Sequence, residues 1–496
     1  MLSSSSNLYC WTSMLFHRSW ISLVKATGLC TNMAKSKILP IRCDGIDVTP
    51  LQATIGCQIA SFPCTYLGMP LSDKRLKLTD FQELLDKLIK KIAAWKARWI
   101  SSSGRLVLVR FVSSAMPIFL LLAVEQPKWI IKQIDKLRRA FLWAGADAIT
   151  GGKCLVRWSH VCSPVQFGGL GIPDLHKQGL ALKVRWLWLN HRETDKPWHD
   201  LPIPVDKEVK ALFIASTCFI LGDGKSVSFW HDHWLNGEVP ALVFPNLYKH
   251  SKKRKITVNE GLTNSKCISL IKHNPDVDVL SEFINLWHRT QVVLLSERED
   301  VLNWKWTPDG KYYANSAYLY QFWGRIEFPF QELIWKIKIP PKVQFFAWLA
   351  VQGKCLTTDN LAKRGWPHNP LCPLCILGGE SASHLFTSCP FAAGVWGFCL
   401  TKFNFPFQIM PANSTQSFLE WWLSSLQQTT TSKRNQLSAL IMIICWHIWK
   451  ERVNCKKPPH LWLGLQKTTN SLIHCKKHRI SSKLVAKNTD RVIWLI

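Results

Sequence analysis

The residues Cys372, Cys375, His384 and Cys389 have the types and the spacing of a metal-binding set. Zinc binds four nitrogen or sulfur ligands in a tetrahedron, and a Cys-x-x-Cys turn directs two thiolates toward one point. Ser383–Phe386 predicts the start of a helix, from which His384 and Cys389 would close the site. We therefore predict one structural Zn²⁺, because four protein ligands leave no open coordination position for chemistry. The alternative interpretation is ordinary buried thiols and a core histidine.

Two amphipathic segments predict basic helices, over residues 79–99 and 128–143. Thr79 and Gln82 fit a capping box at the start of the first helix, and Gly145 supplies a stop for the second. The apolar side chains at helical spacing are Phe81, Leu84, Leu85, Leu88, Ile92 and Trp95, and then Ile130, Ile134, Leu137 and Phe141. The basic side chains around them are Lys87, Lys90, Lys91, Lys96 and Arg98, and then Lys132, Lys136, Arg138 and Arg139.

Basic residues greatly outnumber acidic residues in this chain. It has 62 Lys and Arg against 33 Asp and Glu, which gives a formal net charge of +29. Such an excess suits a polyanion partner, and nucleic acid is the leading candidate. We predict phosphate contacts from Lys87, Lys90, Lys91, Arg138 and Arg139. The alternatives are a solvated basic face and a charge excess that serves no partner.

Outside these helices the sequence predicts small β hairpins, so the fold class is mainly α within α+β. One hairpin is predicted at residues 222–230, which begin with Gly222-Asp-Gly224. A second is predicted at residues 304–313, around a Pro-Asp-Gly turn. The glycines of residues 168–172 predict a tight turn, since no Gly-Lys-Ser/Thr accompanies them as in a phosphate-binding loop. Residues 408–435 are polar and predict a loose connection before an apolar helix at residues 437–449.

Two apolar runs raise the question of a membrane span. Residues 106–124 contain Arg110 and Pro117, and residues 437–449 are too few to cross a bilayer. Both runs are predicted as buried helices, and no membrane partner is expected.

The 17 cysteines form no compact framework and no secretory signal is recognisable, which favours an intracellular location and free thiols outside the zinc set. The basic run Lys252–Lys255 fits a nuclear import signal.

The residues around the cysteine–histidine set carry a resemblance to a known family. The motifs near the set are Trp335, Ile339–Val343, Phe345, Phe346, Trp348, Leu349, Leu356, Thr357, Asn360, Leu361, Arg364, Gly365, Pro390 and Trp396. The motifs farther upstream are Thr27–Leu29, Asn32, Lys35–Lys37, Tyr66–Leu71, Gly104, Arg105, Phe141–Trp143, Trp158, Gly168–Ile172, Asp174, Leu175, Gly222–Gly224, Phe229, Trp230, Trp234, Trp304, Trp306, Gly310 and Ser316–Tyr318. Their types and order resemble the C-terminal part of the reverse transcriptase of plant non-LTR (LINE-type) retrotransposons.

This resemblance implies an order of regions along the chain. It implies the end of the polymerase palm at 1–65, a helical thumb-like and connection region at 66–200, a mixed connection region with short hairpins at 201–314, a small helical reverse-transcriptase zinc-binding domain at 315–407, and a polar connection, apolar helix and basic tail at 408–496. Basic helices in a polymerase thumb would follow the phosphates of a template–primer duplex, which adds salt-dependent affinity and little sequence reading.

The aspartates of a polymerase are missing from this chain. A two-metal polymerase needs clustered aspartates to hold Mg²⁺, and the family presents them in an aromatic-x-Asp-Asp turn. The chain contains no Asp-Asp pair. We therefore expect a non-catalytic remnant that binds RNA or DNA non-specifically and takes no small-molecule substrate. The alternatives are a truncated gene model of an active RNA-directed DNA polymerase, and a host protein that uses the zinc domain for protein contacts.

Overall fold

The computed structural model describes residues 19–455, except residues 20, 23, 30–31, 42–46, 67–68, 73, 75, 78, 93–98, 124–127, 150–151, 194, 197–204, 264–274 and 412–416. The chain packs as two compact units, of which the first ends at Lys91 and the second begins at Ile92. Trp95, Lys96 and Arg98 of the first predicted helix, and the basic tail from Lys456 onward, lie outside the described residues. The five predicted regions remain predictions.

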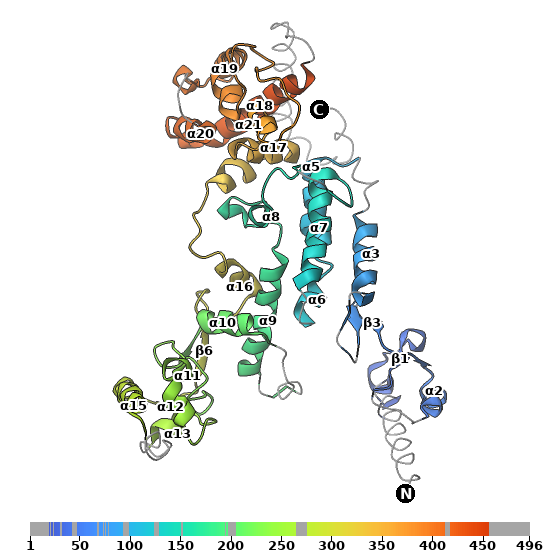
Figure 1. The fold of residues 1–496 in the computed structure, drawn as a ribbon, viewed down its shortest axis with the longest axis vertical. Helices are drawn as coiled ribbons and strands as arrows, with labels where there is room; N and C mark the ends of the chain where they lie inside the picture. Colours follow the sequence, from blue (N-terminus) through green and yellow to red (C-terminus); the bar gives the residue numbers. More distant parts are fainter. Residues whose placement is uncertain are drawn as a thin grey trace. The chain divides into compact units, whose positions relative to one another are not determined.

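Most described residues lie in helices, and the described strands form three two-stranded sheets (Figure 1). This confirms the predicted class, mainly α within α+β. The first unit contains β1 (Lys37–Ile38), α2 (Thr49–Ile55), β2 (Gln58–Ile59), β3 (Cys64–Tyr66), β4 (Met69–Leu71) and α3 (Gln82–Lys91). Strands β1 and β2 are parallel, and β3 and β4 are antiparallel.

The second unit contains the longer helices. Its first part contains α5 (Ser102–Val107), the π-helix η3 (Leu108–Ser113), α6 (Ile118–Ala123), α7 (Lys128–Ala144), α8 (Trp158–Val161) and α9 (Leu175–Arg192). Its middle part contains α10 (Lys207–Ser216), β5 (Thr217–Ile220), α11 (Pro240–Val243), α12 (Pro245–His250), α13 (Val258–Leu262), α15 (Val277–Thr290) and β6 (Val301–Trp304). Its last part contains α16 (Ala314–Tyr320), the π-helix η6 (Gln331–Trp335), α17 (Pro341–Val351), α18 (Thr358–Ala362), the π-helix η7 (His384–Ser388), α19 (Pro390–Lys402), α20 (Phe418–Gln427) and α21 (Thr431–Asn454).

Helix α3 confirms the first basic helix as far as it is described, but its start differs from the prediction. A 3-10 turn precedes it, and the Asp80 carboxylate accepts a hydrogen bond from the Lys77 N–H at 2.6 Å. The predicted capping box between Thr79 and Gln82 is wrong, because the Gln82 amide donates instead to Asp86 at 3.0 Å. Leucines at helical spacing along α3 are buried as predicted.

Helix α7 confirms the second basic helix, and Ile130, Ile134 and Phe141 are buried on its apolar face. The apolar run at residues 106–124 forms α5, η3 and α6, and the run at 437–449 lies within α21, where most of its side chains are buried. Both runs are helical as predicted, but the first is only partly buried, because Val107, Phe111 and Phe119 are exposed. Within the described ranges, no helix is long and apolar enough to cross a membrane.

Strand β5 pairs antiparallel with the distant strand β6, with Thr217 opposite Trp304. Both predicted hairpins are therefore wrong. The segment after Gly222 forms a loop around the Asp300 carboxylate, which accepts hydrogen bonds from the N–H groups of Gly222 and Gly224 at 2.8 and 2.9 Å. The Pro-Asp-Gly segment does form a turn, in which the Trp304 N–H donates to the Gly310 carbonyl at 2.9 Å, but residues 311–313 form no strand.

Residues 408–435 do not form the predicted loose connection throughout. Helix α20 begins within this range with a capping box between Ser417 and Glu420, and α21 begins at Thr431. The polar composition of this range favoured the prediction of a loop over that of a helix. Trp421 and Trp422 are buried and fix α20 in the core.

The last helices that the structure describes pack around one core, which supports the cysteine–histidine set. Helix α21 packs against α17, α19 and α20, which are orange to red in Figure 1. Phe346 of α17 lies 5.3 Å from the ring of Trp446 and 6.0 Å from that of Phe386. The predicted tight turn at residues 168–172 joins this core, because the Gly168 carbonyl accepts a hydrogen bond from the Trp348 indole at 2.8 Å.

Candidate zinc centre and basic surface

The structure brings Cys372, Cys375, His384 and Cys389 together, although they span two loops and a helix start. Their four ligand atoms all lie within 4.8 Å of one another, and the Cys375 sulfur lies 3.3 Å from His384 Nε2. A tetrahedral zinc with Zn–S distances of about 2.3 Å separates its donors by roughly 3.8 Å. The set therefore suits Zn²⁺ after a small contraction, with Nε2 as the histidine donor.

A tight turn presents the first two cysteines. The Cys372 N–H donates to the Gly378 carbonyl at 2.8 Å, and its carbonyl accepts from the Ile376 N–H at 2.8 Å. Ile376 has φ +62°, a left-handed conformation that a β-branched residue rarely adopts. Such strain persists only where the surrounding structure imposes it, and it often marks a functional site.

A single π turn presents the other two ligands. In η7 the Cys389 N–H donates to the His384 carbonyl at 2.7 Å, which closes a turn over the five-residue spacing. The Ser381 hydroxyl accepts from the His384 N–H at 3.0 Å. Leu385 and Phe386 within this turn are buried, so core packing fixes the ligands. The predicted helix start is present, but as a π-helix.

The pKa values of Cys372 and Cys389 are shifted in opposite directions. A hydrogen bond with Cys372 and the backbone N–H groups of Phe391 and Ala392 lower the pKa of Cys389, which precedes the first residue of α19. A hydrogen bond to Cys389, followed by burial, raises the pKa of Cys372 to about 12. A bound Zn²⁺ would take the place of the thiol protons, because cysteine binds metal as the thiolate.

A buried ion pair anchors the turn between the two ligand pairs. Arg452 of α21 donates to both carboxylate oxygens of Glu380, at 2.8 and 2.7 Å, and the Glu380 side chain is 0% exposed. Glu380 also accepts from the Thr358 N–H at 2.9 Å. No local pattern predicts this pair, because 72 positions separate its members and neither belongs to a recognisable motif.

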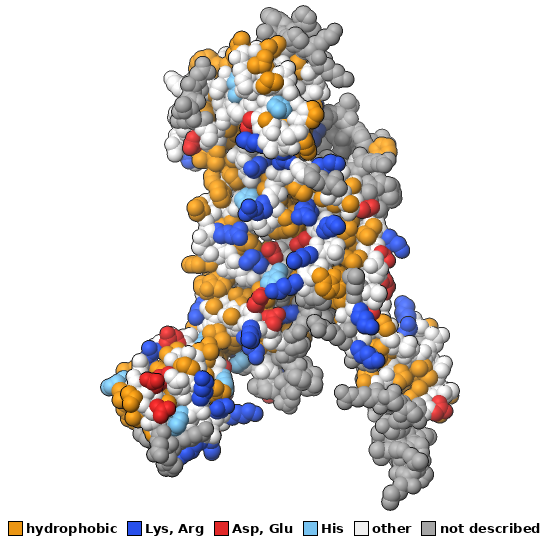
Figure 2. All heavy atoms as spheres, viewed as in Figure 1, with side chains coloured by type: hydrophobic (Ala, Val, Ile, Leu, Met, Phe, Trp, Pro, Cys, Tyr) orange, Lys and Arg blue, Asp and Glu red, His pale blue; other side chains and the backbone are white. Residues whose placement is uncertain are grey.

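The basic surface differs in part from the prediction. Lys87, Lys90 and Lys91 are exposed on α3, and Lys87 forms an ion pair with Glu83 at 2.6 Å. On α7, Lys132 and Lys136 are exposed at four-residue spacing, and neither has an ion-pair partner among the described residues. Figure 2 shows Lys and Arg side chains over much of the visible face.

Arg138 is not part of this surface, so its predicted role in phosphate binding is wrong. Its side chain is fully buried and donates to Asp135 at 2.7 Å and to Ser114 and the Pro173 carbonyl at 2.8 Å. It ties α7 to the segments before α6 and α9. Arg139 is half-buried, and its Nε atom has no hydrogen-bond partner among the described residues. Amphipathic spacing did not separate these two arginines from the exposed lysines.

Two comparisons with known proteins show what this segment and this chain are similar to. Residues 312–396 match the family described as zinc-binding in reverse transcriptase, and this range contains all four candidate ligands. The chain is also similar to an Arabidopsis thaliana protein named "Putative ribonuclease H protein", with 26% identity over 423 residues. The alignment covers 77% of this chain, and the chain spans 65% of the length of that relative. The segment with the four converging ligands is thus similar to the zinc-binding region of reverse transcriptases.

Proposed function

We propose that this chain is a non-catalytic, retrotransposon-derived protein of the non-LTR (LINE) type that binds RNA or DNA non-specifically. The observation that carries the proposal is the four-ligand centre within a segment that matches a reverse-transcriptase zinc-binding family. Structural zinc would hold the last helices together, and the basic helices would contact phosphates. The similarity to a plant protein supports a plant retrotransposon origin.

The charge distribution supports the binding part of this proposal. The net charge is +29, and the exposed lysines of α3 and α7 lie on helices whose opposite faces are buried. Phosphate contacts of this kind give affinity without sequence preference. The interval from Cys372 to Cys389 contains no Lys or Arg, so the zinc centre would contribute little to binding. The exposed run Lys252–Lys255 is accessible to an import receptor and supports a nuclear location.

The purified chain is expected to show no polymerase activity. The reason is the missing aspartate pair, because without it the two Mg²⁺ ions and the triphosphate have no carboxylate ligands at a polymerase site. Primer extension on an RNA template with Mg²⁺ or Mn²⁺ checks this, with an active viral reverse transcriptase as the positive control. Template-dependent incorporation above a mock preparation would favour an active polymerase instead.

Replacing Lys90, Lys91, Lys132 and Lys136 by glutamine is expected to weaken binding to all nucleic acid sequences alike. Log affinity falls with log salt because each phosphate contact releases counterions. Each lost contact should make this fall less steep by about 0.7–0.9. Fluorescence anisotropy over a salt series measures that slope.

The control removes the same charge elsewhere, by glutamine substitution throughout Lys252–Lys255, a run that is exposed between α12 and α13. Equal slopes for the two variants would show that the lysines of α3 and of α7 do not supply the phosphate contacts. A folded, zinc-loaded chain that binds neither RNA nor DNA would favour a zinc domain used for protein contacts.

A further inference from the structure

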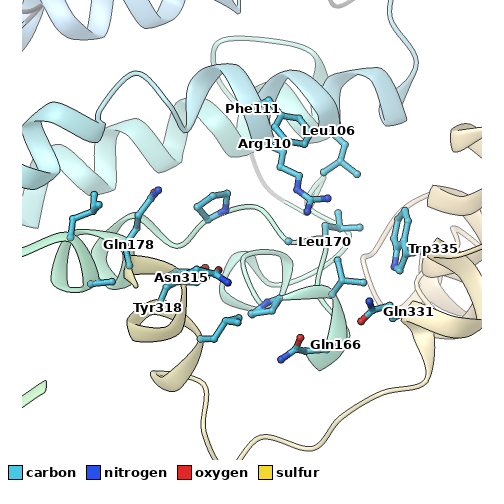
Figure 3. Close-up of a pocket in the computed structure, with 18 of the residues that line it drawn as sticks. Leu106, Arg110, Phe111, Gln166, Leu170, Gln178, Asn315, Tyr318, Gln331 and Trp335 are labelled. Carbon is cyan, nitrogen blue, oxygen red and sulfur yellow. The ribbon is translucent and has the colours of Figure 1, made fainter. Parts of the chain in front are cut away.

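A cavity of about 840 Å³ lies within the second unit, where the helical region meets the start of the family match (Figure 3). Its walls come from η3, from α9 and the loop before it, and from α16 and η6. Pockets for small ligands have volumes of roughly 300–1,000 Å³. This cavity is therefore large enough for a nucleotide-sized molecule.

The lining has the chemistry of a site for an anion with an aromatic group. It contains the cations Arg110 and Lys336, and none of the lining residues is Asp or Glu. Lys336 forms an exposed ion pair with Glu332, so Arg110 is the cation that remains available. Phe111 and Trp335 supply aromatic surface, and the side-chain amides come from Gln166, Gln178, Asn315 and Gln331.

Arg110 is an exposed side chain that can meet a ligand in the cavity. Figure 3 shows its guanidinium pointing from η3 into the cavity. It has no ion-pair partner in the described part of the chain, and it lies 5.3 Å from the Phe111 ring. Gly171, with φ +65°, lies beneath it, and a Cβ at that position would stand 3.3 Å from the guanidinium carbon. The absence of a side chain at Gly171 therefore leaves room for this arginine.

Two buried polar atoms of the cavity lining have no hydrogen-bond partner in the part of the chain that the structure describes. Oε1 of Gln178 and Nε1 of Trp335 are buried without a hydrogen bond to any described residue. Leaving such a group unsatisfied destabilises a protein, so native proteins seldom leave many. The edge of a nucleobase carries both donors and acceptors that suit these atoms and the neighbouring amides.

The backbone of the cavity wall is also unusual. Two of its elements, η3 with Arg110 and η6 with Trp335, are π-helices, and the third described π-helix, η7, carries the candidate zinc ligand His384. π-helical turns are rare and often lie at functional sites. This second observation is independent of the lining chemistry.

We propose that this cavity binds one nucleotide unit, with the phosphate on Arg110 and the base near Trp335 and the side-chain amides. An apolar peptide would leave Arg110 and the amides unused, and an inorganic anion would leave the aromatic surface unused. The inference rests on the proposed nucleic-acid binding and adds a single-strand site to it. The unit comes either from a single strand or from a free nucleotide, which share this chemistry.

The test compares Arg110→Gln with Arg192→Gln in the full chain. Arg192 is a matched control, because it is exposed, lies 5.8 Å from the Trp188 ring and is outside the cavity. Anisotropy of a labelled 12-nucleotide oligouridylate should show about tenfold weaker binding for Arg110→Gln, since a hydrogen bond to a charged group is lost. Arg192→Gln should change affinity less than twofold.

Photocrosslinking with 5-iodouridine in the same oligonucleotide locates the base. Crosslinks are expected in the peptides that contain Phe111 or Trp335, and Trp335→Leu should reduce them, whereas Trp323→Leu at an exposed tryptophan should not. If uridine monophosphate competes with the oligonucleotide and binds with similar affinity, the bound unit is a free nucleotide. If it does not compete, the bound unit belongs to a single strand.

Two results would overturn the inference, and they can be told apart. If the wild type binds the oligonucleotide but Arg110→Gln matches Arg192→Gln and crosslinks lie elsewhere, the cavity inference fails and the proposed function stands. If the wild type binds neither single-stranded nor duplex nucleic acid, and does not bind uridine monophosphate, both fail.

Discussion

Cys375→Ser is expected to remove zinc from the protein and to unfold the region around residues 372–389. Binding of structural zinc is worth on the order of 10 kcal/mol in small modules, which is comparable to the whole free energy of unfolding of a typical domain. Without the ion, the strained turn at Ile376 and the crowded thiols of Cys372 and Cys389 lose the ligand that holds them. Atomic absorption should show close to no zinc per chain, and limited proteolysis should cut within this region.

The matched control is Cys154→Ser, because Cys154 is a half-buried free cysteine outside the ligand set. It should keep the zinc content of the wild type. Full zinc content in Cys375→Ser would mean that the assignment of ligands is wrong.

Glu380→Gln is expected to destabilise the zinc region by about 3–5 kcal/mol, the usual cost of breaking a buried ion pair from one side. The substitution removes the charge that compensates Arg452, whose side chain is only 16% exposed. Zinc release during a urea titration, followed with a chromogenic chelator, should occur at lower urea than in the wild type. This readout follows the zinc region separately from the rest of a multi-unit chain.

Two further variants decide whether the ion pair is the cause. Glu332→Gln breaks an exposed ion pair with Lys336, and such pairs contribute about 0–1 kcal/mol, so zinc release should hardly change. The double variant Glu380→Leu, Arg452→Met removes both charges and should recover much of the loss. A Glu380→Gln variant as stable as Glu332→Gln would contradict the role of Glu380.

The four candidate ligands were predictable because their signal is local. The Cys-x-x-Cys pair and the five-residue step from His384 to Cys389 each fit within one turn, so spacing alone predicts that they meet. Helices α3 and α7 were predictable for a similar reason, since their apolar residues recur at helical spacing. The π geometry of η7 has no comparable signature in the sequence.

Long-range partners account for most of what the sequence did not predict. Strands β5 and β6 pair across a long stretch of chain, and the turn residues near each strand wrongly favoured local hairpins. The spacing of Arg138 is that of any basic residue on an amphipathic helix. Its burial depends on hydrogen bonds to Ser114 and to the Pro173 carbonyl, which lie far away in the sequence. The Glu380–Arg452 pair and the cavity around Arg110 likewise join segments that no local pattern relates.

X-ray absorption at the zinc edge of the purified chain tests the central claim most directly. It should show one zinc per chain, with three sulfur neighbours at about 2.3 Å and one nitrogen at about 2.0 Å. These neighbours correspond to Cys372, Cys375, Cys389 and His384. Absence of bound zinc, or a shell of oxygen atoms in place of the three sulfurs, would contradict the account.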